Sequence, residues 1–388
     1  MVYQLTEELE MLRQVVRRMA EEKVAPRAAA IDEEDAYPWD LKELFAAQGL
    51  LGAGVPDEYG GTGQGLPAVC LIVEEIARVS ASASLIVAAQ ELGLMPILLA
   101  GTEEQKKKYL PGLASGERIC AFALTEPNAG SDAGSIRTRA RREGDVYLLS
   151  GQKCFITNGG IADVYTVFAS TDPGRGLKGL SAFIVEKDYP GFTVGKKERK
   201  MGVRGSPTAE LIFEDCPVPA ANLLGKEGDG FKIAMMTLDR TRPVIGAQAV
   251  GIAQGALDYA VNYTRERVQF GRPIASFQGL QFMMADMATR VEAARQLVYR
   301  AAFFIEDAAT RGASTGEISR LSSMSKLFAS DVAMQVTVDA VQLLGGYGYM
   351  REYPLERMMR DAKITQIYEG TNQIQRLVIA RTLLEKEK

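Results

Sequence analysis

The chain lacks histidine altogether, and its 388 residues include only four cysteines. Without histidine, a Ser-His-Asp triad, a Cys-His pair and every histidine-ligated metal site are excluded. Any proton transfer must therefore fall to Glu, Asp, Lys, Tyr or Cys. The cysteines, Cys70, Cys120, Cys154 and Cys216, are widely spaced and form no CxxC pair. We predict four buried, reduced thiols in a cytoplasmic protein, and no metal site.

The chain also lacks an excess of basic residues and a long uninterrupted apolar run. The formal net charge of −4 argues against a nucleic-acid partner, which would require a basic face. The N-terminal segment MVYQLTEELEMLRQ is acidic early and has no apolar centre, so it does not fit a signal or transit peptide. Residues 85–100 are interrupted by Gln90, Glu91, Gly93 and Pro96, and fall short of the roughly 18 apolar residues that a membrane span needs. We expect no membrane insertion.

Helical patterns are present from residue 1 to 118. Leu5, Leu9, Leu12, Val16 and Met19 recur at helical spacing behind a candidate N-cap, Thr6. The sequence Thr102-Glu-Glu-Gln105 is a capping box ahead of another helix. Residues 69–100 are rich in Ala, Leu, Ile and Val without a strong polar face, which is typical of buried helices.

The pattern changes twice along the chain. Residues 119–229 contain short β-prone segments separated by turns: 120–124, 146–149, 154–157, 164–169, 181–185, 192–194 and 210–213. From residue 230 to 388, four long helical segments follow: 235–267, 278–311, 317–344 and 354–384. We predict an α+β multidomain chain with an N-terminal helical domain (1–118), a small β-barrel-like or sandwich domain (119–229) and a C-terminal four-helix bundle (230–388).

Two glycine-rich stretches do not indicate a dinucleotide fingerprint. Residues 60–65 follow no convincing strand, and residues 345–348 follow a helix, whereas that fingerprint requires a strand, a turn and a helix in succession. The segment 122–132 (FALTEPNAGSD) is more informative, because its turn offers Thr125, Ser131 and several backbone N–H groups. Such a concave run of donors suits an anionic or carbonyl-rich ligand, although a polar surface loop would look the same.

At this segment the sequence begins to resemble the acyl-CoA dehydrogenase family, in its short- and medium-chain branch. Further motifs follow in order over nearly the whole chain: GQKCFITNG at 151–159, LDRTRP at 238–243, RVQFG at 267–271, FQ at 277–278, QLLGG at 342–346 and IYEGTNQIQ at 367–375. Taken alone, Arg267 could be a solvated charge at a helix end, Gln342 a polar residue on a helix face, and Tyr368-Glu369 a surface pair. Their joint order favours the family.

The resemblance implies FAD as the cofactor and gives each matching residue a role. Phe122, Leu124 and Thr125 would contact the isoalloxazine ring, flanked by Phe155, where many relatives have Trp, and by Thr157 near N5. Ser131 would lie at the flavin phosphate or the acyl-CoA. The adenosine and pyrophosphate end would be bound across the subunit interface of a homotetramer by Arg267, Phe270, Gln278, Gln342, Gly345 and Gly346, with Thr371 and Gln373 completing the site. Asp239, Arg242, Tyr368 and Gly370 would bind acyl-CoA.

Glu369 is the predicted catalytic base. The implied reaction removes the α-proton of an acyl-CoA thioester while the β-hydride passes to FAD N5, giving trans-2-enoyl-CoA. Burial beside an apolar acyl chain would raise the carboxyl pKa from about 4.3 toward working pH, where a base transfers a proton more effectively. Gly370 would let the backbone approach the thioester closely. Some branches place the base on another helix, but the matching position here, Thr241, has no carboxylate.

The resemblance also implies fatty acid β-oxidation, with an electron-transfer flavoprotein as electron acceptor. In the glutaryl-CoA branch of the family the matching helix carries an Arg, whereas residues 80–95 here contain no Arg or Lys. The resemblance therefore implies a straight or branched short-to-medium acyl chain in preference to a dicarboxylic one. Two alternatives stay open. One is an oxidase-like flavoenzyme that passes electrons to O₂, and the other is a non-catalytic scaffold protein that kept the fold.

Overall fold

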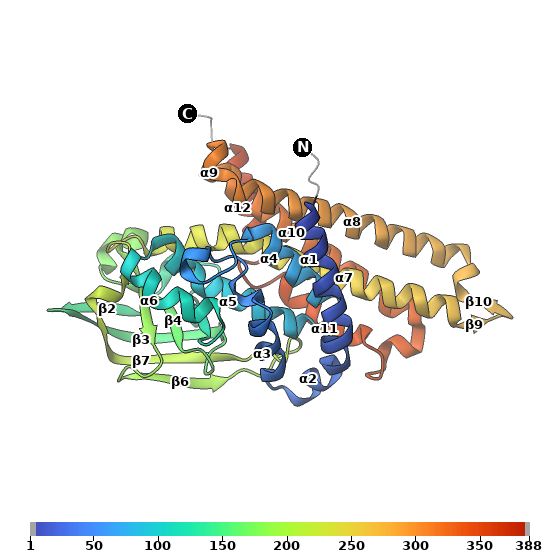
Figure 1. The fold of residues 1–388 in the computed structure, drawn as a ribbon, viewed down its shortest axis with the longest axis horizontal. Coiled ribbons are helices and arrows are strands. Elements are labelled where there is room, and N and C mark those ends of the chain that lie inside the picture. Colours follow the sequence, from blue (N-terminus) through green and yellow to red (C-terminus); the bar gives the residue numbers. More distant parts are fainter. Residues whose placement is uncertain (1–4, 385–388) are drawn as a thin grey trace.

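The computed structural model describes residues 5–384 and has helices, then a sheet, then helices along the chain. The predicted order of helical, β and helical parts is confirmed (Figure 1). The sheet occupies one end of the molecule, and the long C-terminal helices extend from it toward the opposite end. All four cysteines are buried and unpaired, as expected for structural thiols.

The N-terminal part consists of six α-helices: α1 (Glu7–Met19), α2 (Ala28–Glu34), α3 (Trp39–Ala47), α4 (Gly65–Ala77), α5 (Ala81–Ala100) and α6 (Glu103–Ala114). Both predicted caps are confirmed: the Thr6 hydroxyl accepts a hydrogen bond from the Leu9 amide, and Thr102 with Gln105 forms a capping box. The apolar stretch 69–100 divides at Ser80, which caps α5. Apart from Gly65, Leu92 and the last three residues of α5, both α4 and α5 are buried.

Two helical stretches, α5 and Thr315–Tyr349, are long and apolar enough to cross a membrane by length and composition alone. In the fold, 78% of the apolar window in the first and 50% of that in the second is buried. A helix in the core of a globular protein meets the same criterion, so this finding carries little weight for membrane insertion.

Eight strands form one sheet in the order β6-β7-β3-β2-β4-β5-β8, with β1 paired to β4. Their bounds are β1 (Cys120–Ala123), β2 (Arg139–Glu143), β3 (Val146–Thr157), β4 (Val164–Ser170), β5 (Leu180–Glu186), β6 (Phe192–Lys197), β7 (Thr208–Pro219) and β8 (Leu223–Leu224). The sheet curves over its own core: Tyr147 of β3 contacts Phe183 of β5, and Tyr165 of β4 contacts Phe192 of β6, each with ring centroids 4.9 Å apart. Neither pair lies on neighbouring strands.

The sequence analysis missed β2, because this strand has the arginine-rich sequence RARRE. Only Ala140 within it is buried, so the alternation that identifies a strand is hidden among charges. Pairing with β3 over the whole of its length stabilises it instead. Buried residues of β1, β4 and β5 share a core with α5, α6 and the first long helix after the sheet, α7 (Gly230–Glu266).

The C-terminal part contains α7 (Gly230–Glu266), α8 (Gln278–Glu306), α9 (Ala308–Arg311), α10 (Thr315–Leu344), α11 (Leu355–Thr365) and α12 (Asn372–Leu384). A two-stranded hairpin, β9 (Val268–Gln269) and β10 (Arg272–Pro273), joins α7 to α8. The expectation of one helix over 354–384 is wrong. The chain leaves the helix after Thr365, and Glu369 and Gly370 adopt left-handed φ values of 50° and 90° before α12 begins.

Candidate active site

Glu369 lies in the short connection between α11 and α12 and points at α7. Its Oε2 atom accepts a hydrogen bond of 2.6 Å from the hydroxyl of Thr241. Its backbone carbonyl accepts two longer bonds, from Arg242 Nε at 3.4 Å and from Gln375 Nε2 at 3.2 Å. A left-handed backbone at a non-glycine residue is strained, and such strain persists only where the surroundings fix it. These contacts fix the direction of the carboxylate.

Burial raises the pKa of Glu369 to about 7, and this effect outweighs three opposing influences. The Thr241 hydrogen bond and the positive charges of Arg242 and Lys326 all favour the ionised form. Part of the residue remains accessible. A carboxylate of this kind is poised near neutral pH, where it exchanges a proton most effectively.

The two residues predicted to face CoA on α7, Asp239 and Arg242, are almost fully buried, with 6% and 3% of their surface exposed. Arg242 Nη1 donates to Asp239 Oδ1 at 2.8 Å, and the hydroxyl of Ser319 also donates to this carboxylate. Because Arg242 also donates to the Glu369 carbonyl, this buried ion pair lies next to Glu369. Direct contact of either residue with CoA stays a prediction.

Tyr368, also predicted to bind substrate, turns its hydroxyl toward the interior. That hydroxyl donates a short hydrogen bond to Oε1 of Gln248 on α7, and burial raises its pKa well above the ordinary value. The neighbouring Gly370 has a left-handed φ of 90°, and a Cβ there would lie 2.6 Å from the side chain of Gln375. The left-handed φ therefore favours glycine at this position.

A second group of predicted residues comes together where β1 ends beside β3. Phe122, Leu124 and Thr125 belong to β1 and its exit, and Phe155 and Thr157 belong to β3. The Cys154 amide donates to the Thr125 carbonyl at 3.0 Å, which joins the two segments. Phe155 has a left-handed φ of 58° at a β-bulge and is 65% exposed. Ser131 is exposed in the loop that follows β1.

Beneath this second group lies a buried ion pair that the sequence analysis missed. Lys153 of β3 has no exposed surface, and its Nζ donates to Glu126 Oε1 at 2.7 Å and to the Leu124 carbonyl at 3.0 Å. Glu126 in turn accepts hydrogen bonds from the amides of Arg137 and Thr138. The pair connects β3 to the loop after β1. A lysine at a buried position of an alternating strand is the sequence signal that could have identified it.

A third group of predicted residues lines a cavity of about 490 Å³ at the other end of α7. Arg267, Gln342, Gly345 and Gly346 all contribute to its lining, and the Arg267 guanidinium lies 5.1 Å from the centroid of the Tyr347 ring. Phe270, at the tip of the β9–β10 hairpin, is 93% exposed, and Gln278 is exposed at the start of α8. Four of the predicted residues thus lie together in the lining of one cavity.

The second and third groups do not come together within one chain. The first turn of α7 packs against β5, and the hairpin follows its last turn, so the whole of this 37-residue helix separates the two groups (Figure 1). At 1.5 Å per residue, that is roughly 55 Å. Glu369 lies near the sheet end, opposite Thr241, and Thr371 and Gln373 lie close to it in sequence at the start of α12.

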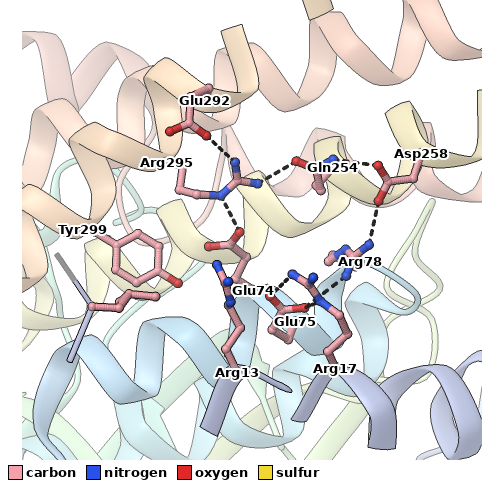
Figure 2. Close-up of a pocket in the computed structure, with 11 residues that line it drawn as sticks. Arg13, Arg17, Glu74, Glu75, Arg78, Gln254, Asp258, Glu292, Arg295 and Tyr299 are labelled. Carbon is pink, nitrogen blue, oxygen red and sulfur yellow. Dashed lines mark hydrogen bonds and ion pairs between the residues drawn. The ribbon is translucent and has the colours of Figure 1, made fainter. Parts of the chain in front are cut away.

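A further cavity, of about 420 Å³, contains none of the predicted residues (Figure 2). It is lined mainly by charged side chains of α1, α4, α7 and α8. Arg17 of α1 pairs with Glu75 at 2.7 Å, and Arg295 of α8 pairs with Glu74 at 2.8 Å. Because acidic and basic groups balance there, this cavity is best described as an ion-pair network that connects four helices.

Family models match nearly the whole chain in three consecutive parts. They are described as the acyl-CoA dehydrogenase N-terminal domain (residues 6–117), middle domain (121–216) and C-terminal domain (228–384). The chain belongs to the acyl-CoA dehydrogenase family. It is therefore an oxidoreductase of the acyl-CoA dehydrogenase type.

Relatives of known sequence and structure support the assignment. An acyl-CoA dehydrogenase of Bacillus subtilis is 55% identical over 381 residues, covering 98% of this chain and 99% of that protein. The butyryl-CoA dehydrogenase structure from Megasphaera elsdenii has a TM-score of 0.95 and 47% identity, covering 99% of this chain and all of the other. A chain in the structure described as "Electron transferring flavoprotein of Acidaminococcus fermentans" has a TM-score of 0.96 and 52% identity over both full chains.

FAD is the cofactor of this acyl-CoA dehydrogenase. The structure of a Bacillus anthracis acyl-CoA dehydrogenase complexed with FAD has a TM-score of 0.91 and 38% identity, covering 99% of this chain and 68% of the other. The residues present fit such a group. Gly345 and Gly346 have no atom within 4 Å of where a Cβ would lie, which leaves room beside Arg267, and Arg267 suits both an adenine ring and a phosphate. Phe155 exposes an apolar ring beside Thr125 and Thr157.

Proposed function

We propose that the protein oxidises acyl-CoA thioesters to trans-2-enoyl-CoA, with Glu369 as the base that removes the α-proton. The observation that carries this proposal is the geometry of Glu369. Its carboxylate is fixed by Thr241, its backbone is held in a left-handed conformation, and burial raises its pKa to about 7. A surface carboxylate without these features would be a weaker base at neutral pH.

The chain's own residues account for orientation and proton transfer. Thr241 donates to Oε2 of Glu369, which leaves Oε1 as the oxygen that would accept the α-proton. We infer that the backbone amide of Glu369, in its left-handed turn, would donate to the thioester carbonyl and stabilise the developing negative charge. FAD held beside Phe155 and Thr157 would supply the hydride acceptor for the Cβ hydrogen. Beside the base, Arg242 is paired with Asp239 and also favours the ionised form of Glu369, which is the form that can accept a proton.

We propose an electron-transfer flavoprotein as the acceptor, because the Acidaminococcus fermentans structure that this chain resembles is described by that name.

A homotetramer is also proposed. The two groups of predicted FAD residues lie at opposite ends of α7, and a second subunit would bring them to one cofactor. The preference for a short acyl chain agrees with the likeness to butyryl-CoA dehydrogenase. A role in β-oxidation and a cytoplasmic location complete the proposal, the latter supported by the four unpaired thiols.

The direct test is anaerobic mixing of the purified flavoprotein with a panel of straight, branched, cyclic and dicarboxylic acyl-CoA thioesters, followed by flavin absorbance. We expect bleaching with short-to-medium straight or branched chains, followed by slow reaction with O₂ and fast reaction with an electron-transfer flavoprotein. Fast formation of hydrogen peroxide would favour the oxidase alternative. Absence of bound flavin, or of bleaching with every thioester, would contradict the proposed function.

A further inference from the structure

Lys326 is a buried lysine on α10 for which neither the family resemblance nor the proposed chemistry gives a role. It has no exposed surface. Its Nζ donates to the Gly370 carbonyl at 2.8 Å and to Oδ1 of Asn372 at 2.9 Å. Both acceptors belong to the turn that follows Glu369. Burying an ammonium group is costly unless it is hydrogen-bonded, so a lysine that served only to fill space would be replaced more stably by an apolar residue.

The turn needs such support, because its backbone is strained. The backbones of Glu369 and Gly370 are both left-handed, and a non-glycine residue such as Glu369 adopts that backbone conformation only when surrounding contacts impose it. Gly370 accepts a second bond from Gln375 Nε2 at 2.9 Å, but Gln375 belongs to α12, which begins just after the turn. Lys326 is on another helix, so its contacts tie the turn to the body of the bundle.

The acceptor Asn372 is itself fixed by α10. Its Nδ2 donates to Asp331 Oδ1 at 2.7 Å and to Ser330 Oγ at 2.9 Å, and Ser330 Oγ also donates to the Lys326 carbonyl at 2.7 Å. The network therefore returns to the helix that carries the lysine. It positions the first residue of α12 as well as the carbonyl beside the base.

Several charged or titratable groups surround Lys326 and Glu369. Arg242 and Asp239 face it from α7, Asp331 lies one turn further along α10, and Tyr368 precedes Glu369 on the same segment. Burial lowers the pKa of Lys326 to about 7, against the attraction of Glu369. The positive charge of Lys326 in turn opposes the rise in the pKa of Glu369.

We propose that Lys326 is a positioning residue for the catalytic base. By donating to Gly370 and Asn372 it locks the left-handed turn, so that the Glu369 carboxylate stays directed at Thr241 and at the substrate. The proposal rests on the proposed function of Glu369. It assigns Lys326 no contact with substrate or cofactor.

Hydrogen–deuterium exchange of the holoprotein tests the positioning without reference to activity. In Lys326→Met, which keeps the length and apolar stem of the side chain, peptides covering residues 366–375 should exchange at least several-fold faster, with other regions unchanged. Lys107→Met is the matched control, because Lys107 is an exposed lysine on α6, outside both α10 and the probed peptides. Its exchange should match that of the wild type.

Kinetics separate positioning from charge. Lys326→Met should lower kcat by roughly 10- to 100-fold, as expected for a misplaced catalytic group, with KM changed little. Because a nearby positive charge is lost, the acidic limb of its kcat/KM profile should move to higher pH. Lys326→Arg should keep that limb in place, since the charge remains, yet should still lower kcat, because the planar guanidinium does not reproduce the two contacts of an ammonium.

Three results would overturn the proposal: unchanged exchange at 366–375 in Lys326→Met, faster exchange spread evenly over the protein, or a wild-type kcat. If Lys326→Met does not fold, Asn372→Ala removes one of the two acceptors and should loosen the same peptides; unchanged exchange there would also overturn it. Failure of the base assignment is measured separately, by turnover in Glu369→Gln. That variant keeps Lys326 and should keep slow exchange at 366–375.

Discussion

Glu369 has a left-handed backbone, and burial raises the pKa of its carboxyl group to about 7. The proposal that it is the base follows from the motif at 367–375 and from the absence of histidine. The contacts of this turn could not be predicted. Thr241, which donates to Glu369, and Lys326, which donates to Gly370, are distant in sequence and reach the turn only through the packing of α7 and α10. The burial of Asp239 and Arg242 could not be predicted either. A charged pair in a motif gives no sign of whether it faces solvent or, as here, lies buried behind the site.

The raised pKa of Glu369 predicts a pH dependence. The group is protonated, and inactive as a base, below about pH 7, and ionised above it. We therefore expect kcat/KM for a good acyl-CoA substrate to rise with pH, with an apparent pKa near 7, and to fall tenfold for each unit further into acid. Stopped-flow measurement of flavin reduction from pH 5 to pH 9 checks this. A profile that is flat down to pH 5 would contradict the raised pKa.

At the level of elements, the sequence predicted most helices and strands but not the break between α11 and α12. The helical pattern of 354–384 continues through Ile367 and Ile374, so periodicity alone joins the two helices. Glycine at position 370 was the available signal, since it permits the left-handed turn that separates them. The missed strand β2 shows the converse case, in which pairing with β3 overrides a poor local pattern.

Gly370→Ala tests the importance of this turn. The new Cβ would lie 2.6 Å from Gln375 Nε2, and alanine at a φ of 90° is itself strained. We expect the free energy of unfolding to fall by about 1 to 3 kcal/mol and flavin reduction by acyl-CoA to slow markedly. Gly316→Ala in the first turn of α10, where the nearest atom is 3.9 Å away, is the control and should not destabilise the protein. Equal stability and activity of the two variants would show that the turn is not required.

For the molecule as a whole, the length of α7 is the governing feature. It separates the residues beside β1 and β3 that are predicted to contact the flavin ring from the cavity around Arg267, although the sequence motifs assign both to one cofactor. The family resemblance already implied a shared site. What the sequence could not show is the distance, which follows only from an unbroken 37-residue helix.

Arg267→Ala should therefore affect cofactor and assembly together. The variant loses a cation that stacks on Tyr347 inside the cavity, and we expect FAD affinity to weaken by roughly 5- to 30-fold. Size-exclusion chromatography with absorbance at flavin and protein wavelengths should show lower flavin content and a looser oligomer. Arg265→Ala, an exposed arginine two residues earlier, serves as the comparison. Full flavin content and an unchanged elution volume in Arg267→Ala would refute the shared site.

The most direct test of the account is anaerobic reduction of the flavin by acyl-CoA in Glu369→Gln. We predict that this variant retains FAD and binds the thioester, but that bleaching slows by roughly 100- to 10,000-fold, the usual contribution of a positioned base. Glu91→Gln, which alters another buried glutamate with a pKa near 7, should bleach at the wild-type rate. Bleaching of Glu369→Gln at close to the wild-type rate would contradict the assignment of Glu369 as the base.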